Sequence, residues 1–353
     1  MQQRYIGIDA HSSSCTLVVM GATGKRIKEV QVETDRGTLI DAVRGIAGER
    51  YICFEEGTLS DWLYEILEPL AKNVDVVHPP KRVRGSKNDS SDAWVLAEAM
   101  RVQSKQVVRV FKQPNKYTML RKAARAYEVI QRDVVRVKNR IHAGYRARGI
   151  SGLGEAIYDP DRRQECMAQL PAGQQCLVEH YCRELDGLNA AHDEARRWLL
   201  EEAEKQPIVA LLQTAPGIGA IRASLIVATL LSPERFRTSR QLWSYCGLGI
   251  VTRSSSDWTR DGDGWRRNHV LQTRGLNRNR NPLLKEVFKG AAFTLTSPKM
   301  ASHPLHQAYR RLLNSGTKPN LARLTLARRI AAAVLAMWKK KEAYDPTRQA
   351  AIA

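Results

Sequence analysis

The sequence predicts an α/β N-terminal domain, a helical arm in the middle and a mainly α-helical C-terminal domain. Short apolar runs alternate with an amphipathic helix over residues 1–113, and apolar residues recur at three- and four-residue spacing through much of residues 114–205. Residues 206–353 combine further helical patterns with a glycine turn and a serine-rich loop. We expect each of these three ranges to form a domain.

Acidic residues end the apolar runs of the N-terminal domain. Asp9 ends the strand predicted from Tyr5 onward, and Glu55 and Glu56 follow a second predicted strand over residues 51–54. A carboxylate at the end of a buried strand is costly without a partner. Acids at the ends of neighbouring strands converge at one edge of an α/β sheet, so we expect a site there.

A helix is predicted to begin near Asp89. The polar cluster from Asn88 supplies N-cap side chains, and an apolar stripe at helical spacing continues through Met100. Asp89 and Asp92 are three residues apart, so their carboxylates lie over one face at the positive end of the helix dipole. The pair fits a site for a divalent ion. The alternative is that one aspartate caps the helix and the other is a solvated acid of the first turn.

Two long helices are predicted in the middle of the chain. Apolar residues at helical spacing run from Tyr117 to Tyr145 and from Val178 to Leu199. Such helices most simply form an antiparallel pair or a coiled-coil arm, either within one chain or as a dimer contact. The first helix is rich in arginines that we expect to bind a nucleic-acid backbone, including Arg121, Arg125, Arg132 and Arg136.

The C-terminal domain contains a glycine turn and a serine cluster. The turn around Gly217 and Gly219 is typical of a helix-hairpin-helix that brings its backbone close to a phosphate, although an ordinary helix connector has the same pattern. The serine cluster follows a β-branched run and precedes a polar Asp/Gly loop, which is also the pattern of a loop whose serines cap turns. The cluster is Ser254, Ser255 and Ser256, and the nearby cations expected to bind nucleic acid are Arg253, Arg260 and Arg274.

Composition favours a polyanionic partner. The 353-residue chain has 56 Lys and Arg against 36 Asp and Glu, a formal net charge of +20, where a merely cationic surface is the alternative. Six cysteines are scattered without Cys-x-x-Cys spacing, which predicts reduced thiols in a cytoplasmic protein. No apolar run reaches the roughly 18 residues that span a bilayer, so we expect no membrane partner.

The acidic motifs resemble those of a known family. Gly7-Ile8-Asp9, Phe54-Glu55-Glu56-Gly57 and the segment 87–93 are similar, in order and spacing, to the four acidic positions of the RuvC/RNase H-like domain in DEDD transposases of the insertion-sequence 110 family. That family usually has Glu-Ala-(Thr/Ser)-Gly at the second motif. Glu55 aligns best because it follows the apolar run directly, and Glu56 is its rival because a slip of one residue turns a strand side chain to the other face.

The resemblance extends through the C-terminal half, from the Pro216 turn to Tyr344-Asp345-Pro346, and so covers nearly the whole chain. The family's nucleophilic serine usually stands in Ser-Ser-Gly. Counting from Gly247 places Ser255 at that position, and the missing glycine leaves Ser254 and Ser256 as rivals.

The resemblance implies a DNA transposase of the bacterial cytoplasm, associated with the nucleoid, that acts as a homodimer or homotetramer on target and donor DNA. It implies guidance by a noncoding bridge RNA, which cations such as Lys285 and Lys289 are placed to bind through its backbone. The chemistry expected is attack on a phosphodiester by Ser255, with Mg²⁺ as cofactor. The expected Mg²⁺ ligands are Asp9, Glu55, Asp89 and Asp92.

Two other functions fit the same residues. A RuvC-like nuclease would hydrolyse DNA with the acids alone and keep the serines as structural residues. A non-catalytic RNA- or DNA-binding protein would use the acids only as helix caps. Both alternatives retain the basic surface, so the composition does not separate them from a transposase.

Overall fold

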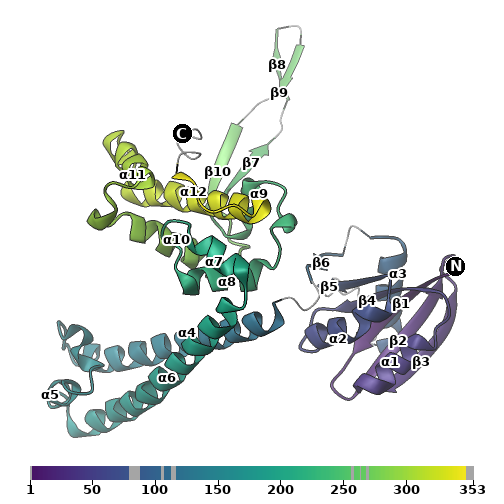
Figure 1. Ribbon diagram of the computed structural model, residues 1–353, viewed down its shortest axis with the longest axis horizontal. Helices are drawn as coiled ribbons and strands as arrows, with labels where there is room; N and C mark the ends of the chain where they lie inside the picture. Colours follow the sequence, from purple (N-terminus) through teal and green to yellow (C-terminus); the bar gives the residue numbers. More distant parts are fainter. Residues whose placement is uncertain are drawn as a thin grey trace. The chain divides into compact units, whose positions relative to one another are not determined.

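The computed structural model describes residues 2–78, 88–104, 107–112, 117–255, 258–262, 264–267 and 270–346. The chain divides into two compact units, Met1–Lys116 and Tyr117–Ala353 (Figure 1). In the described part of the chain, no helix is long and apolar enough to cross a membrane.

The N-terminal unit is built on a six-stranded sheet with the order β3-β2-β1-β4-β5-β6. Strand β1 pairs antiparallel with β2 and parallel with β4, and β5 runs parallel to β4. Its strands are β1 (Gln3–Ala10), β2 (Ser14–Gly21), β3 (Arg26–Glu33), β4 (Glu49–Glu55), β5 (Asn73–Val77) and β6 (Arg109–Val110). Its helices are α1 (Arg36–Arg44), α2 (Ser60–Leu67) and α3 (Asp89–Arg101).

The two faces of this sheet pack against different helices. Ile8 and Phe54 belong to the larger core, which they share with residues of α1 and α2 such as Leu39. Cys53 lies on the opposite face and packs against α3 through Leu96. Because side chains alternate along a strand, the acid that follows Ile8 and the acid that follows Phe54 share the face of α3.

The second unit begins with a helical hairpin. Helices α4 (Thr118–Arg146) and α6 (Ala172–Glu204) pack along each other, and α5 (Arg163–Met167) lies at the far end of the hairpin (Figure 1). A small core around Ile141, Cys166 and Leu185 holds this end together. At the other end, residues such as Leu120 and Leu199 belong to the large core of the same unit. The two long helices are therefore continuous with that core. Their description as a coiled coil stays a prediction.

The rest of the second unit is mainly helical, with two small antiparallel sheets that pair β7 with β10 and β8 with β9. The helices are α7 (Pro207–Gln213), α8 (Ala220–Leu230), α9 (Ser239–Tyr245), α10 (Pro282–Leu295), α11 (Pro304–Asn314) and α12 (Pro319–Lys340). The strands are β7 (Ile250–Ser255), β8 (Trp258–Asp261), β9 (Gly264–Arg267) and β10 (Val270–Leu276).

The predicted α/β N-terminal domain and mainly helical C-terminal region are confirmed. Several details differ from the sequence interpretation. Strand β3 and helix α1 had no predicted counterpart, and the loop expected after the serines contains the β8–β9 hairpin. On α3, Trp94 and Val95 are 37% and 41% exposed, because the helix turns Ala93, Leu96 and Ala97 inward. All six cysteines are free, and Cys176 is exposed.

Candidate active site

A close contact between a strand and a helix shapes the acidic end of the N-terminal unit. A Cβ atom added to Gly7 would overlap the carbonyl oxygen of Ala93 and lie 2.6 Å from the backbone nitrogen of Ala97. Helix α3 therefore rests on β1 backbone to backbone, which only glycine permits. Two residues after Gly7, Asp9 faces the first turn of α3.

Two hydrogen bonds hold the first turn of α3 in place. Asn88 is the N-cap and accepts a 3.0 Å hydrogen bond from the backbone nitrogen of Ser90. The Ser90 hydroxyl donates a 2.8 Å hydrogen bond to the Glu29 carboxylate on β3. The helix start predicted from the sequence is thus confirmed, and its two acids, Asp89 and Asp92, lie in the first turn.

Asp9, His11 and Asp89 form one cluster. Nε2 of His11 lies 3.3 Å from Oδ2 of Asp9 and 3.5 Å from Oδ1 of Asp89. One ligand atom from each of the three residues lies within 4.8 Å of the others, a spacing that suits a single metal ion. The side chain of Asp9 is 14% exposed, whereas the side chains of His11 and Asp89 are 39% and 43% exposed.

Burial and neighbouring charges act together on Asp9. Burial raises the pKa of its carboxyl group above the usual value, and the negative charges of Asp89 and Asp92 raise it further, while His11 opposes the rise. Asp92 thus acts electrostatically on Asp9 although it lies outside the three-residue cluster. Ionisation of Asp9 is therefore less favourable in the folded protein than that of an ordinary aspartate, and a bound cation would offset this.

The donor set fits a hard divalent cation. Oδ2 of Asp9 is a buried oxygen that accepts no hydrogen bond of good geometry from the described residues, although Nε2 of His11 lies 3.3 Å away, and a buried polar atom normally accepts one. Carboxylate oxygens are the preferred ligands of Mg²⁺, and imidazole nitrogen adds a ligand suited to softer divalent ions. Asp9, His11 and Asp89 would hold such an ion directly, and Asp92 would add negative charge nearby.

Glu55 and Glu56 leave the sheet in different environments. Glu55 is the last residue of β4, where it pairs with Val77, and it follows Phe54, the register partner of Ile8. It therefore stands beside Asp9 at the ends of two neighbouring parallel strands. Glu56 instead lies 3.1 Å from Nδ1 of His78, through its Oε2. This arrangement favours Glu55 as the acid that accompanies Asp9.

The sequence interpretation missed His11. It lies immediately after β1, two residues beyond Asp9, so the Asp-x-His spacing at a strand end was the available signal. That spacing alone is common, because a polar turn follows most strands. Only the position of α3 shows that the imidazole lies between two carboxylates.

Two of the candidate serines lie on a strand of the second unit. Ser254 and Ser255 end β7, where they pair with Leu271 and Val270 of β10. Ser256 lies outside the described residues. Arg253 is paired with Gln272 in the same ladder, so the basic and hydroxyl residues share one short antiparallel sheet. Arg274 lies in β10, where the register shifts between Thr273 and Leu276.

The hairpin β8–β9, which follows the serines, exposes two tryptophans. Trp258 and Trp265 are 59% and 68% exposed. In the ladder, Trp258 pairs with Arg267 and Trp265 pairs with Arg260. Aromatic rings next to arginines are the side chains on which nucleic-acid bases stack. The sequence interpretation treated this segment as a polar loop and missed both tryptophans.

The candidate nucleic-acid contacts on α4 and in the glycine turn differ in availability. Arg132 and Arg136 form ion pairs with Glu128 and Asp133 on their own helix, and Arg125 is exposed. Arg121 is half-buried.

Gly217 has a positive φ of 74°, and a Cβ there would lie 2.6 Å from the carbonyl oxygen of Ala291 on α10. Its carbonyl accepts a 2.7 Å hydrogen bond from Arg222. The close packing of α10 is therefore enough to explain why a glycine stands at position 217, and no bound phosphate is needed. Gly219, the exposed N-cap of α8, has open space around it.

Two models of known protein families match the chain. A family model described as a transposase, the DEDD transposase of IS110, matches residues 6–144, and a model of the transposase IS116/IS110/IS902 family matches residues 209–292. A search among curated proteins gave no match. The two family models make the chain a DNA transposase of the DEDD class, with which strand-end acids on an α/β unit and a basic, mainly helical unit agree. The chain belongs to the IS110 family of transposases, which confirms the resemblance seen in its motifs.

The contact at Gly7 gives a first prediction. We expect Gly7→Ala to displace α3, to destabilise the N-terminal unit by about 1–3 kcal/mol as overpacking usually does, and to abolish stabilisation by added Mg²⁺. Thermal unfolding with Mg²⁺ and with EDTA measures both effects. Gly57→Ala is the matched control, because a Cβ at Gly57 meets nothing within 4 Å. Equal Mg²⁺ responses in the two variants would contradict the proposed role of the contact.

Proposed function

We propose that this transposase cuts and rejoins DNA with a serine nucleophile and a Mg²⁺-binding acidic quartet. The quartet is Asp9, Glu55, Asp89 and Asp92, of which Asp9 and Asp89 would contact the ion together with His11, and the nucleophile is Ser255. The observation that carries the proposal is the cluster of Asp9, His11 and Asp89, whose ligand atoms lie within 4.8 Å of one another at the largely buried carboxylate of Asp9.

The fold supports this choice of acids. Strands β1, β2 and β3 form an antiparallel meander, β4 and β5 run parallel to β1, and α3 covers the face that carries the acids. This strand order supports placing the unit in the RuvC/RNase H-like class, in which acids at strand ends hold divalent ions. A bound Mg²⁺ supplies neutralisation of phosphate charge and polarisation of the reacting oxygens.

The covalent step exchanges one phosphodiester for another. The hydroxyl oxygen of Ser255 bonds to phosphorus, one bond between phosphorus and a deoxyribose oxygen breaks, the serine gives up its proton and the departing DNA oxygen takes one up. A DNA hydroxyl that later attacks the serine phosphodiester reverses the exchange and rejoins DNA without an external energy source. The exposed arginine Arg260 of the β8–β9 hairpin suits the charge that develops on the phosphate oxygens.

Guidance by a bridge RNA and assembly as a homodimer or homotetramer complete the proposal. The net charge of +20 and the exposed cations of α4 support a polyanionic partner that extends beyond the DNA at the cleavage site.

Trapping of the covalent intermediate tests the proposed chemistry. End-labelled DNA carrying the element ends is incubated with the full-length protein and its co-purified RNA, in Mg²⁺ or in EDTA, and separated on a denaturing protein gel. We expect a label that migrates with the protein in Mg²⁺ only. Cleavage in Mg²⁺ without any protein-linked DNA would support a RuvC-like nuclease that uses the acids alone, and neither product would support a binding protein.

A further inference from the structure

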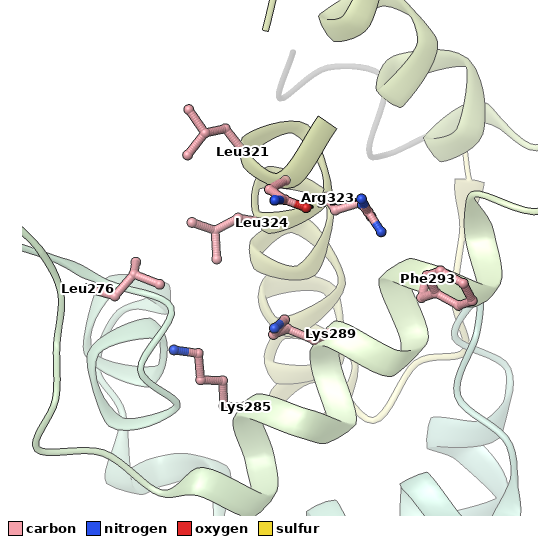
Figure 2. Close-up of a pocket in the computed structure, with 8 residues that line it drawn as sticks. Leu276, Lys285, Lys289, Phe293, Leu321, Arg323 and Leu324 are labelled. Atoms are coloured by element: carbon pink, nitrogen blue, oxygen red, sulfur yellow. Dashed lines mark hydrogen bonds between the residues drawn. The ribbon is translucent and has the colours of Figure 1, made fainter. Parts of the chain in front are cut away.

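A cavity of about 530 Å³ lies in the second unit between α10, α12 and the end of β10 (Figure 2). Lys285, Lys289 and Phe293 line it from α10, where their four-residue spacing places them on one helix face. Arg323 and Leu324 contribute from the first turns of α12. The size is in the range of pockets that bind small organic groups.

The positive charges of this cavity lack carboxylate partners. None of the ion pairs formed between described residues involves Lys285, Lys289 or Arg323. On α10, α12 and β10, the one acidic residue is Glu286, and it is exposed. Burial lowers the pKa of the Lys285 ammonium group, and the neighbouring cations Arg280 and Lys289 lower it further.

The start of α12 adds to this field. The helix has 22 residues, its first turn contains no acid, and no side chain caps its N-terminal N–H groups. The positive end of its dipole therefore faces the same region as the cations. An anion bound there would relieve their mutual repulsion.

The cavity also has an apolar wall that is open to solvent. Phe293 and Leu321 are 65% and 54% exposed, and Leu276 and Leu324 are half-buried. Figure 2 shows Leu276 and Lys285 on one side of Lys289, and Phe293 and Arg323 on the other. Each side of the opening thus carries both a cation and an apolar side chain.

This pairing of surfaces matches the chemistry of a nucleotide. An exposed base buries its flat face against aromatic and aliphatic groups, and its phosphates bind cations. A duplex presents phosphates to a protein but keeps its base faces stacked inside, so it has no group to place against Phe293. An acidic peptide would satisfy the cations, but it has no planar ring to stack on that side chain.

We propose that the cavity between α10 and α12 binds one unpaired nucleotide of a nucleic-acid strand. Its base lies against Phe293. Its flanking phosphates lie on Lys285, Lys289 and Arg323. The proposal rests on the proposed function only for the choice of nucleic acid as the partner, because cutting and strand exchange expose unpaired nucleotides.

Equilibrium binding of a short fluorescent oligonucleotide to the full-length protein in EDTA tests the stacking. The probe is single-stranded, as DNA and as RNA, and the same sequence as a duplex is the comparison. We expect Phe293→Ala to weaken single-strand binding by about fivefold or more and to leave duplex binding unchanged, since stacking on one ring is worth about 1–3 kcal/mol. Phe293→Tyr keeps a stacking ring and should retain wild-type affinity. Leu177→Ala is the matched control, because Leu177 is an exposed apolar residue on α6.

Salt dependence of the same binding tests the phosphate contacts. The triple change Lys285→Gln, Lys289→Gln and Arg323→Gln should lower the slope of log affinity against log salt by about 2 for a single strand. Lys340→Gln, at the opposite end of α12, should not lower the slope. A 5-iodouracil probe should cross-link to the tryptic peptide 290–299, which contains Phe293.

Three results would overturn the proposal. These are unchanged single-strand affinity in Phe293→Ala, an equal loss for single-strand and duplex probes, and displacement of the probe by polyglutamate as readily as by unlabelled oligonucleotide. The last result would indicate an acidic protein partner. Because all measurements are made in EDTA without strand cleavage, a failure here leaves the proposed serine chemistry untouched, and a failure of that chemistry leaves this test valid.

Discussion

Asp9→Asn is expected to abolish the protein-linked DNA product and, without metal, to stabilise the folded protein. Loss of a carboxylate that binds the metal directly removes several kcal/mol of transition-state stabilisation. The rate should therefore fall by a factor of about 10³ or more. Asparagine keeps the shape of the side chain but removes the negative charge that Asp89 and Asp92 oppose. The covalent adduct on a denaturing gel and the melting temperature in EDTA measure the two effects.

The raised pKa of Asp9 fixes how this stability difference varies with pH. A raised pKa means that the folded state favours protonated Asp9, so this contribution is complete below the unfolded pKa of about 3.8 and is lost as pH rises through the higher folded value. Asp9→Asn should therefore match the wild type at low pH and exceed it in stability at neutral pH in EDTA. Added Mg²⁺ should reverse the order at neutral pH, because it stabilises only the protein that binds it.

Glu56→Gln is the matched control for the acid site. It also removes one carboxylate at the end of a strand, but Glu56 lies against His78. We expect Glu56→Gln to keep adduct formation and Glu55→Gln to lose it. An active Asp9→Asn protein, or a Glu56→Gln protein as inactive as Asp9→Asn, would contradict the assignment of the quartet.

Ser255→Ala is expected to remove the covalent adduct completely while leaving DNA binding within about twofold of wild type. Without the hydroxyl no serine phosphodiester forms, and no other group of an alanine side chain replaces it. DNA binding stays because one neutral hydroxyl contributes little beside many phosphate contacts. Denaturing gels measure the adduct, and mobility shifts in EDTA measure binding.

Ser254→Ala and Ser256→Ala are the controls for this serine. Each variant removes one hydroxyl of the cluster and leaves the other two in place. If the adduct persists in Ser255→Ala and disappears in one control, the nucleophile is the other serine. If Ser255→Ala still cleaves DNA without any adduct, the acids act alone as a nuclease.

Much of the N-terminal unit could be predicted from local pattern. Apolar runs that end in acidic residues predicted β1 and β4, and the Asn88 cap before an apolar stripe predicted the start of α3. Strand β3 was missed because its residues are mostly exposed, so its sequence has little apolar signal. The β8–β9 hairpin was missed although Asp261-Gly262 is a turn signal between its strands.

The acid site was predictable only in part. The sequence indicated that Asp9, Glu55, Asp89 and Asp92 end or begin elements at one edge of a sheet. It left Glu55 and Glu56 as rivals, and it gave no role to His11. The environments of the two glutamates follow from strand register and from the neighbour His78, neither of which is a local property of the chain.

The sequence by itself determined the class of each unit, the order of the acids, the presence of the two long helices α4 and α6 and the excess of positive charge. These properties follow from residue spacing and composition, which act along the chain. Only the tertiary structure decided that Asp9 meets Asp89 and that α10 and α12 enclose a cationic cavity with an exposed phenyl ring. Both depend on how closely distant segments pack. At the acid site, that distance is set by the absence of a side chain at Gly7, where the backbone of α3 lies directly on β1.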